Sequence, residues 1–155
     1  MMAAWSPQAN VAALRFVKGY AQAQGLRALL DGSIKIFQEE VAAIRLASPG
    51  ISPKLLGTLA GSSAKTRILQ LAEKLGIQAI GEAKMLVPKS VREISHSGKT
   101  IVFRKADLYI PKHRLVLELT TEASQDVMKL TLHKQGQLAD YLLAKRRVII
   151  INHKP

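Results

Sequence analysis

A predicted β-hairpin in the second half of the chain constrains its fold more than any other feature. Residues 105–110 (KADLYI) and 115–121 (LVLELTT) are strand-like, and the polar segment 111–114 (PKHR) separates them. Two such segments around a short turn predict a β-hairpin. We expect Ile110 to pair with Leu115, and this pair fixes the register of the whole hairpin.

The register places two carboxylates opposite each other. Asp107 pairs with Glu118, and both lie on one face. The next pair on this face is Lys105 with Thr120. Because the Cβ atoms of opposed residues lie only ~5 Å apart, two carboxylates destabilise a sheet unless a cation lies between them. That cation is either a side chain such as Lys105 or an oxygen-coordinated metal ion that keeps waters for chemistry. In the first case the pair is an ordinary polar surface bridged by lysines.

A helix and a buried strand are predicted to follow the hairpin. Residues 124–145 have helical periodicity and end in basic residues, and the apolar run 148–151 (VIII) is typical of a buried strand. On the helix, Lys134, Gln137 and Tyr141 share one face. A polar stripe on a helix that packs against a sheet indicates a functional role.

In this order of elements the chain resembles the PD-(D/E)xK nuclease superfamily, especially its RecB-like branch. The motif acids of the family fall on Asp107 and Glu118, and the Q-x-x-x-Y signature falls on Gln137 to Tyr141. The similarity covers about residues 63–152. It implies an α/β fold with a restriction-endonuclease-like αβββαβ core.

The resemblance also implies an activity and roles for individual residues. It implies a metal-dependent nuclease that hydrolyses phosphodiester bonds, with DNA the favoured substrate and Mg2+ or Mn2+ bound by Asp107 and Glu118. Gln137 would orient the site, and Tyr141 would position the nucleic acid strand. In the family the helix before the first strand often donates a further acid. We take Glu73 as the first candidate and Glu82 as the second.

The sequence departs from the family pattern at two positions. Thr120 stands where the family has the lysine of its E-x-K motif, and Ala106 stands where a proline often precedes the motif aspartate. The lysine neutralises developing charge, so its loss lowers activity unless another ammonium reaches the site. Lys105 and Lys134 are the candidates for this role. If neither reaches the site, the domain binds nucleic acid without cutting it.

Composition favours a polyanionic partner. The 155 residues are 48% hydrophobic and carry a net charge of +12, with 23 Lys and Arg against 11 Asp and Glu. Most of the basic excess lies after residue 60, where seventeen basic residues face eight acidic ones. Such a charge indicates nucleic acid, with DNA favoured, although the lysines are also compatible with an ordinary solvated surface. The candidate contacts to nucleic acid are Lys65, Arg67, Arg104, Lys112, His113, Arg114 and Lys129.

Other partners and compartments are less compatible with the sequence. No segment approaches the ~20 apolar residues of a transmembrane helix, and the first residues do not resemble a secretory signal. We therefore expect no membrane partner and a cytoplasmic location. The chain contains no cysteine, which excludes disulfides, thiol nucleophiles and cysteine-bound metal clusters.

The first part of the chain is predicted to be helical. Breaks near Gly25, Asp31–Ser33, Ser48–Gly50 and Gly61–Ser63 divide it into four helices, the last of which runs from about Ser63 to Leu75. We assign residues 1–62 to a helical N-terminal region and 63–155 to the nuclease-like domain. The third and fourth helices form either a helix-turn-helix, with Lys65 and Arg67 near bases, or an ordinary helical hairpin.

Two alternatives to the nuclease remain open. The first is a non-catalytic nucleic-acid-binding protein, for which Thr120 is the main argument. The second is a structural or assembly protein that forms a homodimer through its N-terminal helices. Strands are further expected near residues 91–95 and 100–104, the second continuing into the strand of Asp107.

Overall fold

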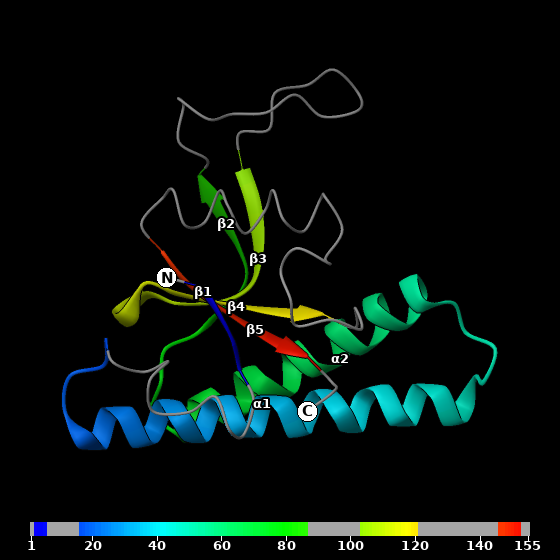
Figure 1. Cartoon of the computed structure of the whole chain (residues 1–155), viewed down its shortest axis with the longest axis horizontal. Coiled ribbons are helices and arrows are strands. Elements are labelled where there is room, and N and C mark those ends of the chain that lie inside the picture. Colours follow the sequence, from blue (N-terminus) through cyan, green and yellow to red (C-terminus); the bar gives the residue numbers. More distant parts are fainter. Residues whose placement is uncertain (1, 6–15, 87–102, 121–145, 153–155) are drawn as a thin grey trace.

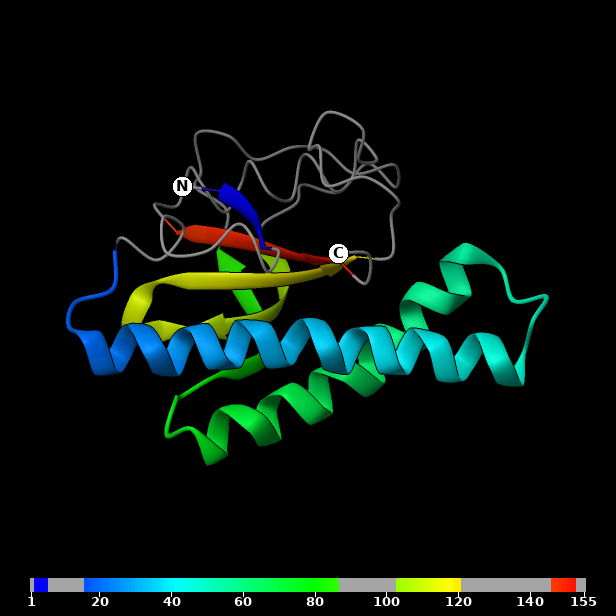
Figure 2. The ribbon, with the colours of Figure 1, turned by 60° about the horizontal axis from the view of Figure 1, so that its bottom comes forward.

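Two long helices cover one face of a five-stranded mixed sheet. The computed structural model describes residues 2–5, 16–86, 103–120 and 146–152. Figures 1 and 2 show helices α1 and α2 together on one side of the strands, joined by a short connection at the end of the helical pair. The predicted mixed α/β fold is confirmed at this level.

Helix α1 (Tyr20–Ala47) is longer than the sequence predicts. It runs unbroken through Gly25 and Gly32, so the predicted breaks at these positions are wrong. At Gly32 the reason is packing: a Cβ atom there would collide with the Leu71 side chain of the neighbouring helix. The glycine therefore permits a close approach between the helices and does not end one of them.

Helix α2 (Pro53–Lys74) begins where the sequence predicts, but it continues through the predicted break at Gly61–Ser63. Ser52 caps it by accepting a hydrogen bond from the Leu55 N–H at 3.3 Å, with Pro53 in the first turn. The predicted break at Gly61–Ser63 is wrong, and with it both the helix-turn-helix and the helical hairpin that depended on it. Ala60 and Ala64, on either side of this segment, are fully buried in the core, which offsets the roughly 1 kcal/mol that a helical glycine costs.

The sheet has the strand order β1-β5-β4-β3-β2. Strands β2, β3 and β4 form an antiparallel meander, while β5 pairs in parallel with β4, and β1 in parallel with β5. The bounds are β1 Met2–Trp5, β2 Ile80–Leu86, β3 Phe103–Ile110, β4 Leu115–Thr120 and β5 Arg147–Asn152.

The predicted hairpin and the predicted final strand are both present. Ile110 pairs with Leu115 as expected, and a short 3-10 turn (Pro111–His113) followed by Arg114 with φ 48° connects the strands. The second partner of β3 is β2, a strand that was not predicted from the sequence. The strand expected at residues 91–95 and the helix expected at 124–145 lie outside the described residues.

The core lies on both faces of the sheet. One cluster lies under the helices and contains Phe37, Ile68 and alternate residues of β3, β4 and β5, while a second, smaller cluster covers the opposite face. Every residue of the central strand β4 is consequently buried. A division of the chain at 62/63 would cut α2 in its middle and divide the larger cluster.

The helices of the described ranges also bear on the membrane prediction. Neither α1 nor α2 combines the length and the apolar character that a membrane-spanning helix needs. Both helices carry charged side chains, among them Arg45 near the end of α1 and Lys74 at the end of α2.

Candidate functional site

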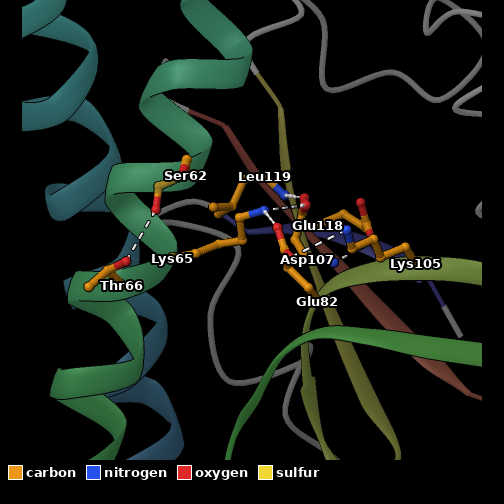
Figure 3. A network of polar contacts seen from close by, with 8 residues as sticks. All are labelled: Ser62, Lys65, Thr66, Glu82, Lys105, Asp107, Glu118 and Leu119. Atoms are coloured by element: carbon orange, nitrogen blue, oxygen red, sulfur yellow. Dashed lines mark hydrogen bonds and ion pairs between the residues drawn. The ribbon is translucent and has the colours of Figure 1, made fainter.

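Three carboxylates lie at one level on three neighbouring strands. Glu82 of β2, Asp107 of β3 and Glu118 of β4 occupy corresponding positions in the registers of the meander (Figure 3). The pairs that fix this level are Gly81 with Leu108, Ala83 with Ala106, and Leu108 with Leu117. We call Glu82, Asp107 and Glu118 the acidic row.

Side chains replace the backbone ladder between Asp107 and Glu118. Regular pairing of β3 with β4 runs from Ile110 to Leu108. At the next position the Asp107 N–H donates to Glu118 Oε1 at 3.2 Å, and the Leu119 N–H donates to Asp107 Oδ2 at 2.8 Å. Each carboxylate thus accepts a hydrogen bond from the opposite strand, which offsets the repulsion that opposed acids would otherwise cause.

The two carboxylates meet at the gap between the strands, not side by side on one regular face. Alternation along β4 places Glu118 on the face of Val116, away from the helices, and its side chain is only 1% exposed. Asp107 meets a side chain from α2, on the helix-covered side. The prediction that both carboxylates lie on one face is therefore wrong, because the regular pairing of β3 with β4 ends before Asp107.

A lysine from α2 supplies the cation that the sequence analysis expected. Lys65 Nζ lies 3.0 Å from Glu82 Oε1 and 3.7 Å from Asp107 Oδ1, and its side chain is 17% exposed. Lys105, the predicted bridging residue, meets Glu82 Oε2 at 3.3 Å from the solvent side. The β3–β4 ladder ends at the Leu108–Leu117 pair, so the expected Lys105–Thr120 pair is absent from it, and Lys105 pairs with Lys84 of β2.

Both lysines change the ionisation of Glu82. The hydrogen bond from Lys65, and then that from Lys105, lower the pKa of the Glu82 carboxyl below its ordinary value. Glu82 also has φ 53°, in the left-handed region that non-glycine residues rarely adopt. The pair Glu82–Asp107 is missing from the otherwise regular β2–β3 ladder, consistent with this local distortion.

The structure also shows where the two further candidate acids and the threonine of the predicted site lie. Glu73, the first choice for an additional acid, is exposed on α2 and lies eight residues, or about 12 Å of helix, beyond Lys65. The second choice, Glu82, belongs to the acidic row. Thr120 is buried at the end of β4 and pairs with Asn152 of β5.

Arg67 is held by acids of the neighbouring helix. Its guanidinium lies 2.8 Å from Glu39 Oε2 and 3.2 Å from Glu40 Oε1, and these hydrogen bonds raise the pKa of Arg67. This ion-pair network connects α1 with α2. Arg67 therefore has a role between the helices, and its predicted contact with nucleic acid stays a prediction.

The remaining predicted contacts to nucleic acid divide into two groups. Lys112, His113 and Arg114 lie together at the β3–β4 turn, and Arg104 lies in β3, where it pairs with Met85. The other residues of the predicted site lie outside the described part of the chain: Lys129, Lys134, Gln137 and Tyr141.

The donor chemistry of the acidic row is compatible with Mg2+ or Mn2+. Mg2+ is commonly held by one or two carboxylates, with waters and substrate phosphates completing its coordination. Asp107 and Glu118 supply only oxygen donors, and each accepts a backbone N–H of the other's strand. Within the described ranges, no group of three or more His, Cys, Asp or Glu side chains is arranged to hold a metal ion. A bound ion would thus depend on waters and substrate for most of its coordination.

Comparison with protein-family models, with curated proteins and with solved structures finds no match for this chain.

Proposed function

We propose that the chain is a metal-dependent nuclease that hydrolyses phosphodiester bonds of nucleic acid, with DNA as the favoured substrate. The observation that carries the proposal is the acidic row, in which Glu82 and Asp107 lie beside Lys65 and Glu118 accepts the Asp107 N–H. The order of α2, β2, β3, β4 and β5 supports a restriction-endonuclease-like αβββαβ core, whose second helix would come from residues 121–145.

In this proposal the residues of the site have different roles. Asp107 and Glu118 would hold Mg2+ or Mn2+, which supplies Lewis-acid activation of water and phosphate. Lys65 would take the part of the lysine that Thr120 replaces, because its ammonium lies 3.7 Å from Asp107 Oδ1. There it would stabilise negative charge that develops on the phosphate. Gln137 and Tyr141 keep the roles that the resemblance implies.

A second candidate function is nucleic-acid binding without cleavage. The contact between Lys65 and Asp107 favours it, because an ammonium already neutralises the carboxylate that would bind a metal ion. Thr120 favours it as well, since its hydroxyl carries no positive charge. In this alternative the acidic row is structural, and the positive net charge alone attracts nucleic acid.

Isosteric substitutions distinguish the two candidates. Asp107→Asn and Glu118→Gln remove a negative charge but keep an oxygen that can accept the N–H of Leu119 or of Asp107, so the strands should stay paired. We expect each variant to lose at least about a hundredfold in Mg2+- or Mn2+-dependent cleavage of DNA, because metal ligation needs the charge. Binding of DNA measured in EDTA should change little.

Glu73→Gln is the matched control, because it removes an acid on the same helix as Lys65 but about 12 Å along it. It should cleave as fast as the wild type. If the wild type cleaves neither DNA nor RNA with either metal, the nuclease proposal fails and binding without cleavage takes its place. A Glu118→Gln variant with wild-type activity would contradict the assigned site.

A further inference from the structure

A pocket lies at the turn end of the hairpin, away from the acidic row. It has a volume of about 350 Å3 and lies between the start of α1, the α2–β2 connection and the 3-10 turn. Its apolar wall includes Leu26, Leu75, Ile77 and Ile110. This volume is at the lower end of the roughly 300–1,000 Å3 typical of small-molecule sites, so it suits a ligand of small size.

A second hollow of about 270 Å3 continues this pocket toward β5. The two share Gln22, Lys112 and His113, and the second adds Lys18 and Arg147. Because they share these three residues, the two hollows adjoin, and we call them together the groove, with an apolar end and a cationic end. None of the described residues that line either hollow is acidic.

Several contacts hold the cationic end in place. The Arg147 guanidinium lies 4.5 Å from the ring centre of Phe16, and its NH1 donates to the His113 carbonyl at 2.9 Å. Phe16 meets the His113 ring edge-on, with 6.0 Å between centroids. In the amide orientation that satisfies its neighbours, Gln22 accepts a hydrogen bond from Lys112 Nζ at 3.1 Å. Arg147 and Lys112 are thus positioned before any ligand binds, which lowers the entropic cost of binding.

The electrostatic environment of His113 is consistent with an anion site. Partial burial, followed by the charges of Lys112 and Arg147, lowers the pKa of His113 below its ordinary value. The imidazole is therefore mainly neutral near pH 7 and lies in a positive potential. A dianion placed among these three side chains would reverse that effect and favour the protonated ring.

We propose that this groove binds a nucleoside monophosphate. The phosphate would lie among Lys18, Lys112 and Arg147, where ammonium and guanidinium groups make charge-assisted hydrogen bonds. The nucleoside would occupy the apolar end, where Gln78 is among the lining residues and would offer its amide to a base edge. The groove shares no residue with the acidic row, so the tests of this site and of the nuclease proposal are independent.

Calorimetric titration with adenosine 5′-monophosphate, adenosine and inorganic phosphate tests the site on the full chain. We expect saturable binding of the monophosphate, and at least about tenfold weaker binding of either part alone, since each occupies only one end of the groove. Equal affinity for phosphate and the monophosphate would overturn the nucleoside half of the proposal. Absence of saturable binding of the monophosphate would overturn all of it.

Two variants address the two ends of the groove. Lys112→Gln removes a charge at the phosphate end and should weaken monophosphate binding about tenfold or more. Ala21→Trp, on the exposed first turn of α1, should fill the apolar end and abolish monophosphate binding. Lys54→Gln, at the far end of the helical pair, is the charge-matched control and should bind as the wild type does. An equal loss in Lys54→Gln would show attraction by net charge alone and contradict the site.

An NMR titration of His113 locates the bound ligand. Saturating monophosphate should raise the pKa of His113, because the dianion favours the imidazolium. Binding that leaves the pKa of His113 unchanged would place the ligand elsewhere and overturn the assignment. This readout needs no substitution, so it remains valid even if a variant folds poorly.

Discussion

A carboxylate inside a sheet is stable only when its oxygens have partners, and Glu118 illustrates how the chain meets this requirement. Its side chain is 1% exposed, and it accepts the Asp107 N–H at the position where the regular ladder stops. Burial of an unpaired ion would cost several kcal/mol. The hydrogen bond from the Asp107 N–H to Glu118 therefore stabilises the folded state. Asp107 in turn accepts a backbone N–H and meets Lys65.

At the same scale, Lys65 should control the ionisation of Glu82 more strongly than Lys105 does. Replacement of Lys65 by methionine removes the largest cause of the depressed pKa, so the pKa of Glu82 should rise toward its ordinary value. Lys105→Met should raise it less. Carboxyl-detected NMR titration measures both shifts.

The same variants should alter acid stability in a defined direction. A depressed folded-state pKa stabilises the protein above the unfolded pKa of Glu82, and this contribution is lost as the pH falls through the folded pKa. Lys65→Met should therefore lose less stability on acidification than the wild type. A larger shift of the Glu82 pKa in Lys105→Met would show that the solvent-side lysine is the dominant partner.

At the scale of the elements, both helices contain glycines at positions where the sequence predicts a break. Gly32 lies where α1 comes close to Leu71 of α2, whereas nothing lies within 4 Å of a Cβ atom added at Gly61. Both positions are inside helices, where glycine costs roughly 0.5–1 kcal/mol relative to alanine. Only at Gly32 does close packing explain the absence of a side chain.

This difference predicts unequal effects of two identical substitutions. Gly61→Ala should stabilise the protein by roughly 0.5–1 kcal/mol, because it lowers the conformational entropy of the unfolded chain without a clash. Gly32→Ala should be less favourable by about 1 kcal/mol, since the Leu71 side chain must move and disturb its packing. Urea unfolding followed by circular dichroism measures both. If Gly61→Ala destabilises the protein, α2 is broken at this point in solution.

For the molecule as a whole, the uneven pairing of charges determines which basic residues can meet a polyanion. Lys65 and Arg67 face acids of the chain itself, whereas Lys112, His113 and Arg147 gather around the turn end of the sheet. A net charge of +12 remains to attract phosphate groups. The homodimer expected from the N-terminal helices stays a prediction.

The salt dependence of nucleic-acid binding should reflect this distribution. We expect log K for DNA to fall linearly with log salt concentration, because phosphate neutralisation releases counterions. Arg67→Gln should leave the slope unchanged, since Glu39 and Glu40 hold the guanidinium. Fluorescence anisotropy across a salt series measures the slope. A decrease of about one unit in Arg67→Gln would identify Arg67 as a phosphate contact after all.

The sequence by itself determined the features that depend on local signals. The hairpin with its Ile110–Leu115 pair, the final buried strand and the start of α2 at Ser52–Pro53 all follow from alternation, apolar runs and capping chemistry. These signals lie within a few residues, so no knowledge of distant contacts is needed. Strand β2 was missed because Gly81 and Lys84 interrupt its apolar pattern.

Only the tertiary structure decided which residues meet. The glycines in α1 and α2 gave a local signal for breaks, and burial between the helices overrode it. The partner of Asp107 was predicted as Lys105, two residues away on the same strand, and is Lys65, more than forty residues earlier on α2. Such contacts depend on how a helix lies across a sheet, and this follows from packing of the whole core, which no short segment encodes.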